Sequence, residues 1–189
     1  MRLTPHALTL GLAVLLAGCS GDAARFAVTT PPVTEKVRIS FGAVEVRDVS
    51  LPSYAAADEI HLQTEDGTLT SSSGVLWADA PERAVALEIS QNLARLSGRR
   101  VASEPWPFEA FPDARLEVRF AELVAVTTGT FRASGQYFVA VEEGVGRERS
   151  GLFDLSVPFD PEGGPSAIAA ARGQLILDLS RFLAQKGLK

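Results

Sequence analysis

The chain has 189 residues, of which 46% are hydrophobic and 22% are charged, and its formal net charge is −5 at pH 7. This length suits one domain with a substantial core, and the hydrophobic content excludes an intrinsically disordered chain. Because the chain is acidic and has no cluster of lysine and arginine, it is a poor candidate for binding nucleic acid or for electrostatic docking onto anionic lipid.

The first residues have the layout of a bacterial secretion signal. Arg2 supplies positive charge, and residues 7–17 form an apolar stretch of roughly 11 residues, which is typical of a signal and too short to span a membrane. The motif L-A-G-C at residues 16–19 resembles the lipobox of bacterial lipoproteins. The resemblance implies cleavage between Gly18 and Cys19, a diacylglycerol on the thiol and an acyl chain on the new amine. The alternative is a free thiol after an ordinary signal.

Cys19 is the one cysteine of the chain, so lipidation leaves no thiol for a disulfide or for catalysis. Each buried CH₂ of an acyl chain contributes about 0.8 kcal/mol to membrane binding, so two or three chains make a durable anchor. Lipoproteins with this signal stay in the inner membrane when aspartate directly follows the cysteine. Ser20 stands there instead, which predicts an outer-membrane anchor that faces the periplasm. We expect no cofactor besides the acyl chains on Cys19.

The signal divides the chain into three parts. Residues 1–18 are a cleaved signal peptide, residues 19–24 a lipidated tether, and residues 25–189 a single periplasmic domain. Loss of Arg2 with the signal makes the mature chain one unit more acidic. The tether spans about 17 Å when it is fully extended. The domain therefore sits close to its membrane, and its partners must come to it.

Strand signals dominate the first part of the domain. Alternation of apolar and polar residues predicts strands at residues 25–28, 37–46, 59–64 and 68–71. Pro31-Pro32 marks a loop after the first strand, and Glu65-Asp66-Gly67 predicts a hairpin turn between the last two. A polar loop is expected at residues 71–74.

Two amphipathic helices are predicted. The first begins at Asp79-Ala80-Pro81-Glu82, where Asp79 is the expected cap, and it ends before Gly98. The second covers residues 166–186. Apolar residues recur along each at helical spacing: Val85, Ile89, Leu93 and Leu96 in the first, and Ile168, Leu175, Leu179, Phe182 and Leu183 in the second.

Between the helices lie further strands. A short strand at residues 99–103 and a proline-containing loop at 104–113 precede three alternating runs, which begin near Leu116, Phe131 and Phe153. Short turns join these runs, so we expect an antiparallel meander with one buried face. The fold class is therefore α+β: a single domain with a mostly antiparallel sheet and two helices packed on one face.

The mature chain lacks the usual combinations of catalytic residues. Its one histidine, His61, lies in a predicted strand, and no G-x-S-x-G motif accompanies it. A metal site of histidine and cysteine is close to excluded, and Glu65-Asp66-Gly67 lacks the repeated ligands of a calcium loop. Gly144-Val145-Gly146 does not continue as a phosphate-binding fingerprint. We predict that the protein is not an enzyme and holds no metal.

Two aromatic residues are candidate partner contacts. Tyr54 follows a predicted strand in the motif L-P-S-Y, and Trp77 directly precedes the first helix. For Trp77 the favoured alternative is a core contact at the helix entry. For Tyr54, a packing contact and a partner contact are equally favoured interpretations.

These motifs together resemble a known family. A strand ending in L-P-x-Y, a second strand, and W-A-D before an amphipathic helix are similar to the PqiC (YmbA-type) lipoproteins, which are ABC-type transport auxiliary components linked to MCE proteins. Ala55 stands where this family usually has leucine, and Asp79-Ala80-Pro81 where a proline-leucine pair is common. The matching stretches are residues 44–54, 59–64, 76–96 and 116–182.

The resemblance implies an accessory subunit in the outer membrane that caps a periplasm-spanning tunnel, built by an MCE-domain protein of the PqiB-like type. Such a tunnel moves lipids between the two membranes and supports envelope integrity. Its rotational symmetry implies a homo-oligomeric ring of this subunit. The alternative function is a plug or scaffold lipoprotein of another outer-membrane or secretion machine. A lipid-modifying hydrolase is disfavoured because the nucleophile and base are missing.

Overall fold

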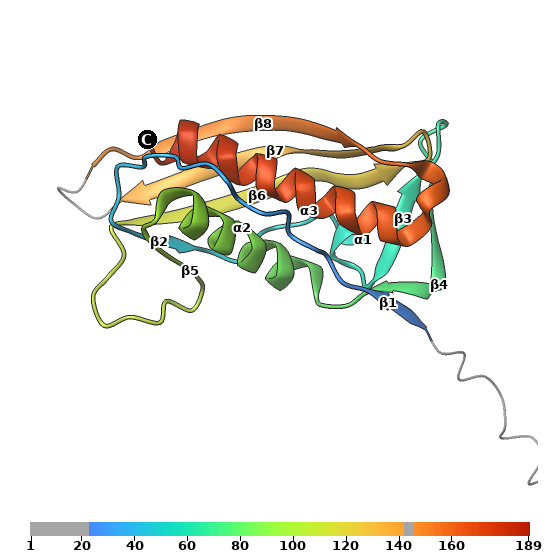
Figure 1. Ribbon diagram of the computed structural model, residues 1–189, viewed down its shortest axis with the longest axis horizontal. Coiled ribbons are helices and arrows are strands. Elements are labelled where there is room, and N and C mark those ends of the chain that lie inside the picture. The colour runs from blue at the N-terminus through green and yellow to red at the C-terminus, as the bar shows by residue number, and fades with distance from the viewer. Residues whose placement is uncertain (1–22, 142–145) are drawn as a thin grey trace, which may run out of the picture.

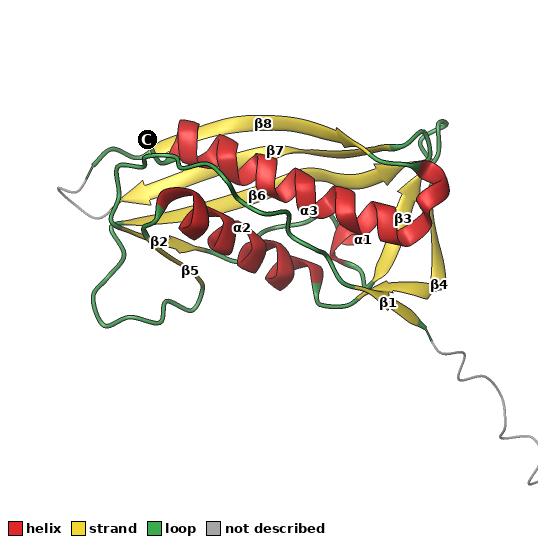
Figure 2. Cartoon of the chain, in the orientation of Figure 1, coloured by secondary structure: helices red, strands yellow, loops and turns green. Residues whose placement is uncertain are grey.

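The computed structural model describes residues 23–141 and 146–189, which form an α+β fold (Figures 1 and 2). The helices are α1 (Ser53–Ala56), α2 (Pro81–Ser97) and α3 (Gly164–Phe182), with a 3₁₀ turn η1 (Pro161–Gly163) before α3 and a π-helical turn η2 (Leu183–Gly187) after it. The strands are β1 (Ala24–Phe26), β2 (Ala43–Val46), β3 (Glu59–Gln63), β4 (Leu69–Trp77), β5 (Arg100–Ser103), β6 (Ala114–Val126), β7 (Thr130–Val141) and β8 (Arg149–Pro158).

The long strand β6 organises a single eight-stranded sheet. On one side, β6, β7 and β8 form an antiparallel meander, as predicted. On the other side, β2 pairs in parallel with the first residues of β6, and β3 with its last residues. β5 extends β2 in parallel, while β4 pairs antiparallel with β3 and parallel with β1. The sheet is thus mixed. The pairs β3–β4, β6–β7 and β7–β8 are antiparallel, and the other pairs are parallel.

Helices α2 and α3 lie side by side on one face of this sheet, as predicted (Figure 2). Their apolar stripes face the sheet and form the core between the two layers. The stripe residues of α2 are all fully buried, and those of α3 are buried except for the half-exposed Phe182. Gly98 ends α2 in the left-handed conformation, with φ of 67°, which explains a glycine at that position.

The strand predicted at residues 37–46 is shorter than expected. Only Ala43–Val46 forms β2, although Ile39 and Phe41 are buried as the alternation predicted. The backbone before β2 bonds elsewhere: Val37 N–H donates to the carbonyl of Leu96 at 2.8 Å, and Ser40 N–H donates to that of Leu188 at 2.7 Å. The segment is therefore extended and buried, but it pairs with helix ends and not with a strand.

Two local predictions were wrong. The expected polar loop at residues 71–74 is part of β4, which pairs with β3 at the edge of the sheet, where side chains 69–74 are exposed and can be polar. Asp79 is not the cap of α2. The capping position is Ala80, and Asp79 instead accepts from the Ala80 N–H at 2.8 Å and pairs with Arg83. The expected first turn at Pro81 is correct.

A β-bulge in β6 requires a glycine on the facing strand. The register between β6 and β7 shifts between Phe120 and Glu122, where Gly135 lies opposite Phe120. A Cβ atom on Gly135 would lie 2.1 Å from the carbonyl oxygen of Arg119 and 2.8 Å from Cζ of Phe153. No side chain fits there without moving backbone, so this glycine allows the aromatic pair of Phe120 and Phe153, at 5.3 Å between ring centroids.

Candidate functional site

The lipid-attachment residues lie outside the described part of the chain. Gly18 and Cys19 are not among residues 23–141 and 146–189, so cleavage and lipidation stay predictions. The same holds for most of the Gly144-Val145-Gly146 motif. Within those two ranges, no helix combines the length and apolarity that a membrane crossing needs. The same ranges contain no group of three histidine, cysteine, aspartate or glutamate residues placed to hold a metal.

The structure brings Tyr54, His61 and Trp77 together around one small void. Its volume is about 20 Å³, which is room for about one water molecule and not for a substrate. The edge of the Tyr54 ring meets His61, at 6.3 Å between centroids. The Tyr54 hydroxyl accepts from the Leu123 N–H at 3.4 Å, and partial burial raises the pKa of Tyr54. These contacts tie α1 to β3 and β6, and they give the half-buried Tyr54 a packing function.

Trp77 belongs to the core. It ends β4 with 7% of its surface exposed, and the Arg172 guanidinium lies 4.6 Å from the centre of its ring. Its carbonyl accepts from Arg25 of β1 at 3.1 Å. Trp77 therefore joins the sheet to α3 and presents almost no surface to a partner.

Arg172 also forms a buried ion pair between the two helices. Its Nη2 lies 3.2 Å from Oε1 of Glu88 on α2, and the two side chains are 2% and 13% exposed. Burial is the main influence on both groups: it raises the pKa of Glu88 and lowers the pKa of Arg172. The pair therefore carries a large desolvation cost, which the cation–π contact with Trp77 offsets in part.

An exposed aromatic loop lies between β5 and β6. We call residues 104–113, with the sequence EPWPFEAFPD, the aromatic loop. Phe111 is 76% exposed and Phe108 is 42% exposed, which makes them two of the four exposed large hydrophobic residues in the described chain. In Figure 1 the loop projects from the end of the sheet opposite to β1. The sequence signal was available, because three aromatic residues stand among three prolines, but the sequence predictions placed no site here.

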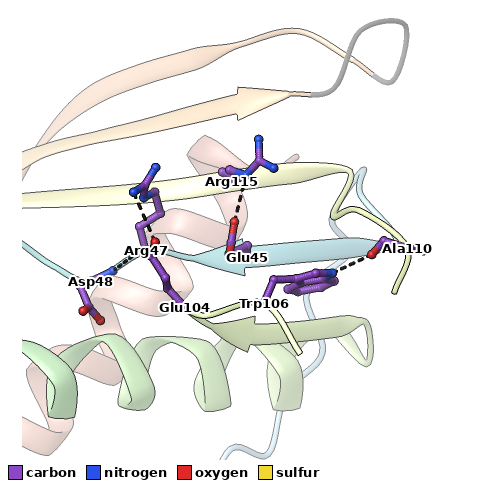
Figure 3. A network of polar contacts seen from close by, with 7 residues as sticks. All are labelled: Glu45, Arg47, Asp48, Glu104, Trp106, Ala110 and Arg115. Carbon is purple, nitrogen blue, oxygen red and sulfur yellow. Dashed lines mark hydrogen bonds and ion pairs between the residues drawn. The ribbon is translucent and has the colours of Figure 1, made fainter. Parts of the chain in front are cut away.

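The aromatic loop is held in shape by its own contacts and by both of its ends. Trp106 Nε1 donates to the carbonyl of Ala110 at 2.7 Å across the loop (Figure 3). The rings of Trp106 and Phe108 pack edge to face at 4.9 Å, and Arg100 lies 5.5 Å from the centre of the Phe108 ring. These contacts hold the side chains of Trp106 and Phe108 in place.

Both ends of the loop are bonded to the segments around β2. Glu104 lies 3.3 Å from Arg47 and accepts from the Asp48 N–H at 3.4 Å (Figure 3). Asp113 accepts from the N–H groups of Gly42 at 2.7 Å and Ala43 at 3.0 Å. Two of the three carboxylates of the loop are thus used internally. Glu109 is exposed and leaves the tip acidic. An ordered, apolar and slightly acidic tip is suited to protein docking.

Comparison with known proteins places the chain in a family. The family model described as ABC-type transport auxiliary lipoprotein component matches residues 26–184. No curated protein matches the chain.

Two solved structures with TM-scores above 0.6 share the fold. A crystal structure described as an uncharacterized protein is 18% identical, covers 86% of this chain and 97% of its own, and has a TM-score of 0.67. A Xanthomonas campestris protein of the family model DUF330 is 15% identical, with 85% and 92% coverage and a TM-score of 0.62. The PelC dodecamer from Paraburkholderia phytofirmans is 10% identical, with 84% and 98% coverage and a TM-score of 0.46.

Proposed function

This chain belongs to the family of ABC-type transport auxiliary lipoprotein components, and on that premise we propose that it is an outer-membrane accessory subunit of an MCE-linked lipid transport system. Cys19 anchors it on the periplasmic face. The domain docks on the tunnel formed by an MCE-domain protein of the PqiB-like type. It takes no part in covalent chemistry, since its family is a transport auxiliary and not an enzyme family.

Three observations support this proposal. The family match covers nearly all of the domain. The L-A-G-C motif with Ser20 after it predicts an outer-membrane anchor, and the short tether keeps the domain near that membrane. A subunit held at one membrane needs a partner that spans the periplasm in order to serve transport between the two membranes.

The aromatic loop carries the docking part of the proposal. Exposed aromatic side chains that are ordered before binding contribute most to interface energies, because little entropy is lost when they dock. Phe108 meets both conditions, and Phe111 is exposed and directly follows Ala110, whose carbonyl accepts the bond from Trp106. The loop lies at the far end of the domain from β1, where the tether enters (Figure 1). We propose that Phe111 inserts into an apolar pocket of the MCE partner, with a basic group of that partner facing Glu109.

We also propose that the subunit forms a homo-oligomeric ring on the tunnel, since a cap with identical contacts to a rotationally symmetric partner is cyclic. A ring would repeat the aromatic loop around the axis, so weak single contacts would add to a tight assembly. The mass of a soluble form beginning at Ser20 tests this. A strict monomer, both in solution and when anchored in vesicles, would contradict the ring.

The docking experiment compares two equally exposed apolar residues. Phe111→Ser should weaken co-purification with the MCE partner by about 2 kcal/mol or more, which is about thirtyfold in Kd. Leu152→Ser is the matched control, because Leu152 is 71% exposed but lies on β8, far from the loop in sequence. Both variants should keep the unfolding midpoint of the wild type, since neither side chain is buried.

Each outcome has a clear meaning. Loss of binding in Phe111→Ser alone supports docking through the aromatic loop. Equal binding by both variants would remove the loop from the interface. If the anchored wild-type protein binds no MCE protein, the transport proposal fails, and the plug or scaffold function of another envelope machine takes its place.

A further inference from the structure

An apolar cleft opens between the β3–β4 hairpin and the start of α3. Its volume is about 430 Å³, which lies in the range of small-molecule sites. The walls come from segments far apart in sequence: the hairpin, the connection from β8 to α3, and the first turns of α3. Its apolar lining includes Ile60, Leu62, Val75, Phe159, Pro165 and Ile168.

The polar groups of the cleft are neutral, with one exception. The neutral polar residues of the lining include Thr70, Ser71, Ser72 and Thr127, and Glu162 is its single charged residue. An exposed carboxylate repels phosphate and carboxylate groups, and no cation in the lining would pair with them. The cleft is therefore suited to a hydrocarbon chain whose polar head stays outside.

The tether brings this cleft to the membrane. Ala24 of β1 pairs with Val75, which lines the cleft. Cys19 stands five residues before Ala24, so an extended tether places the anchored residue at most about 17 Å from Ala24, which lies on the strand next to the cleft. Figure 1 shows β1, the β3–β4 hairpin and the start of α3 at the same end of the molecule.

We propose that this cleft holds one acyl chain of a phospholipid from the bilayer in which Cys19 is anchored. The inference rests on the proposed anchored function, and it assigns the subunit a direct contact with lipid. An acyl chain matches the apolar lining, and the short tether keeps the cleft within reach of the bilayer surface. A free-standing domain would meet such a ligand rarely, because phospholipid monomers are scarce in water.

The test uses the full lipidated protein in vesicles of phosphatidylethanolamine and phosphatidylglycerol. A trace of phospholipid with a photoreactive diazirine in its acyl chain labels whatever contacts that chain. We expect labelled peptides from residues 59–76 and 159–168. Ser71→Trp should fill the cleft and abolish this labelling. Ser150→Trp is the matched control, because Ser150 is exposed on the edge strand β8 and does not line the cleft.

Several results would overturn the proposal. Labelling spread evenly over the surface, or labelling that survives in Ser71→Trp, would show that the cleft does not hold the chain. The soluble form beginning at Ser20 tests a different occupant. If that form is labelled in the cleft but the anchored protein is not, an acyl chain of Cys19 itself fills the site, and a bilayer phospholipid does not.

A partner assay separates this inference from the proposed function. Ser71→Trp should still bind the MCE partner, because the aromatic loop lies at the other end of the domain. In the wild-type protein, intact partner binding without cleft labelling would refute the lipid contact alone. Cleft labelling in a protein that binds no MCE partner would refute the docking function alone.

Discussion

Removing Arg172 while Glu88 remains should destabilise the domain in a way that depends on pH. The Arg172 side chain is 2% exposed, and Nη2 lies 3.2 Å from Oε1 of Glu88. Loss of one partner from a buried pair costs about 3–5 kcal/mol, because the other charge is left without compensation. Arg172→Met keeps much of the side-chain volume, so most of its cost should come from the isolated carboxylate of Glu88 and from the lost contact with Trp77.

The sign of the pH effect follows from the pKa of Glu88. Burial raises this pKa above the ordinary value of 4.5 even beside Arg172, and the attraction of Arg172 is the main influence that lowers it. In Arg172→Met the pKa therefore rises further. A carboxyl whose folded pKa is raised contributes stability below its unfolded pKa and loses it as pH rises through the folded pKa. The variant should be closest to wild type near about pH 5 and most destabilised near about pH 8.

Two further variants make this test decisive. Glu88→Gln removes the carboxyl whose pKa is raised and leaves Arg172 charged, so its cost relative to wild type should not grow as pH rises. Arg172→Met combined with Glu88→Leu removes both charges and should be more stable than either single variant. Urea unfolding of the form beginning at Ser20, followed by tryptophan fluorescence, measures all three. A cost of Arg172→Met below about 1 kcal/mol, or an equal cost at both pH values, would refute the importance of this pair.

Three other predictions concern backbone packing, catalysis and anchoring. Gly135→Ala should lower the free energy of unfolding by about 1–3 kcal/mol in urea, because its Cβ would clash with backbone atoms. Gly74→Ala is the control, because a Cβ there would meet no atom within 4 Å, and its stability should not change. Equal stability of the two variants would refute the steric argument. His61→Ala should leave the envelope phenotype of a complementing gene intact. Loss of function in a folded variant would contradict the prediction that the protein is not an enzyme. Cys19→Ala should release the domain from membranes, and aspartate at position 20 should move it to the inner membrane; normal fractionation of either variant would contradict the lipobox assignment.

Local patterns predicted most of the elements because each pattern reports on burial of one face. The alternation in residues 116–120 and 131–141 and the helical spacing of Val85 to Leu96 lie in strands β6 and β7 and in helix α2 of the structure, with β6 extending further than the pattern. The pattern at residues 37–41 predicted burial correctly but not pairing. Apolar alternation fixes which side chains point inward, whereas the backbone partner depends on elements elsewhere in the chain. The same limit explains the parallel pairing of β2 with β5 and β6.

The proposed docking surface was harder to predict than the fold. Tyr54 and Trp77 stand out in the sequence because they flank predicted elements, yet the structure places both at packing contacts. Phe111 lies in a stretch that sequence reasoning treated as a connection, and its exposure depends on Asp113 and Glu104 holding the loop ends. Exposure of a large aromatic side chain is a tertiary property, so composition alone does not separate a core aromatic residue from a docking one.

The positions of the cleft and of the aromatic loop suggest a division of tasks along the domain. The strand β6 is 13 residues long and joins the two ends. Figure 1 shows β1 at one end of the molecule and the aromatic loop at the other. The apolar cleft opens beside Val75, the partner of Ala24 in β1, and the loop carries the exposed Phe111. A domain that contacts lipid at its anchored end and protein at its far end would place a membrane lipid next to a transport partner. If both proposals hold, a substitution in the cleft should lower lipid delivery without lowering partner affinity, and Phe111→Ser should lower delivery through partner affinity alone.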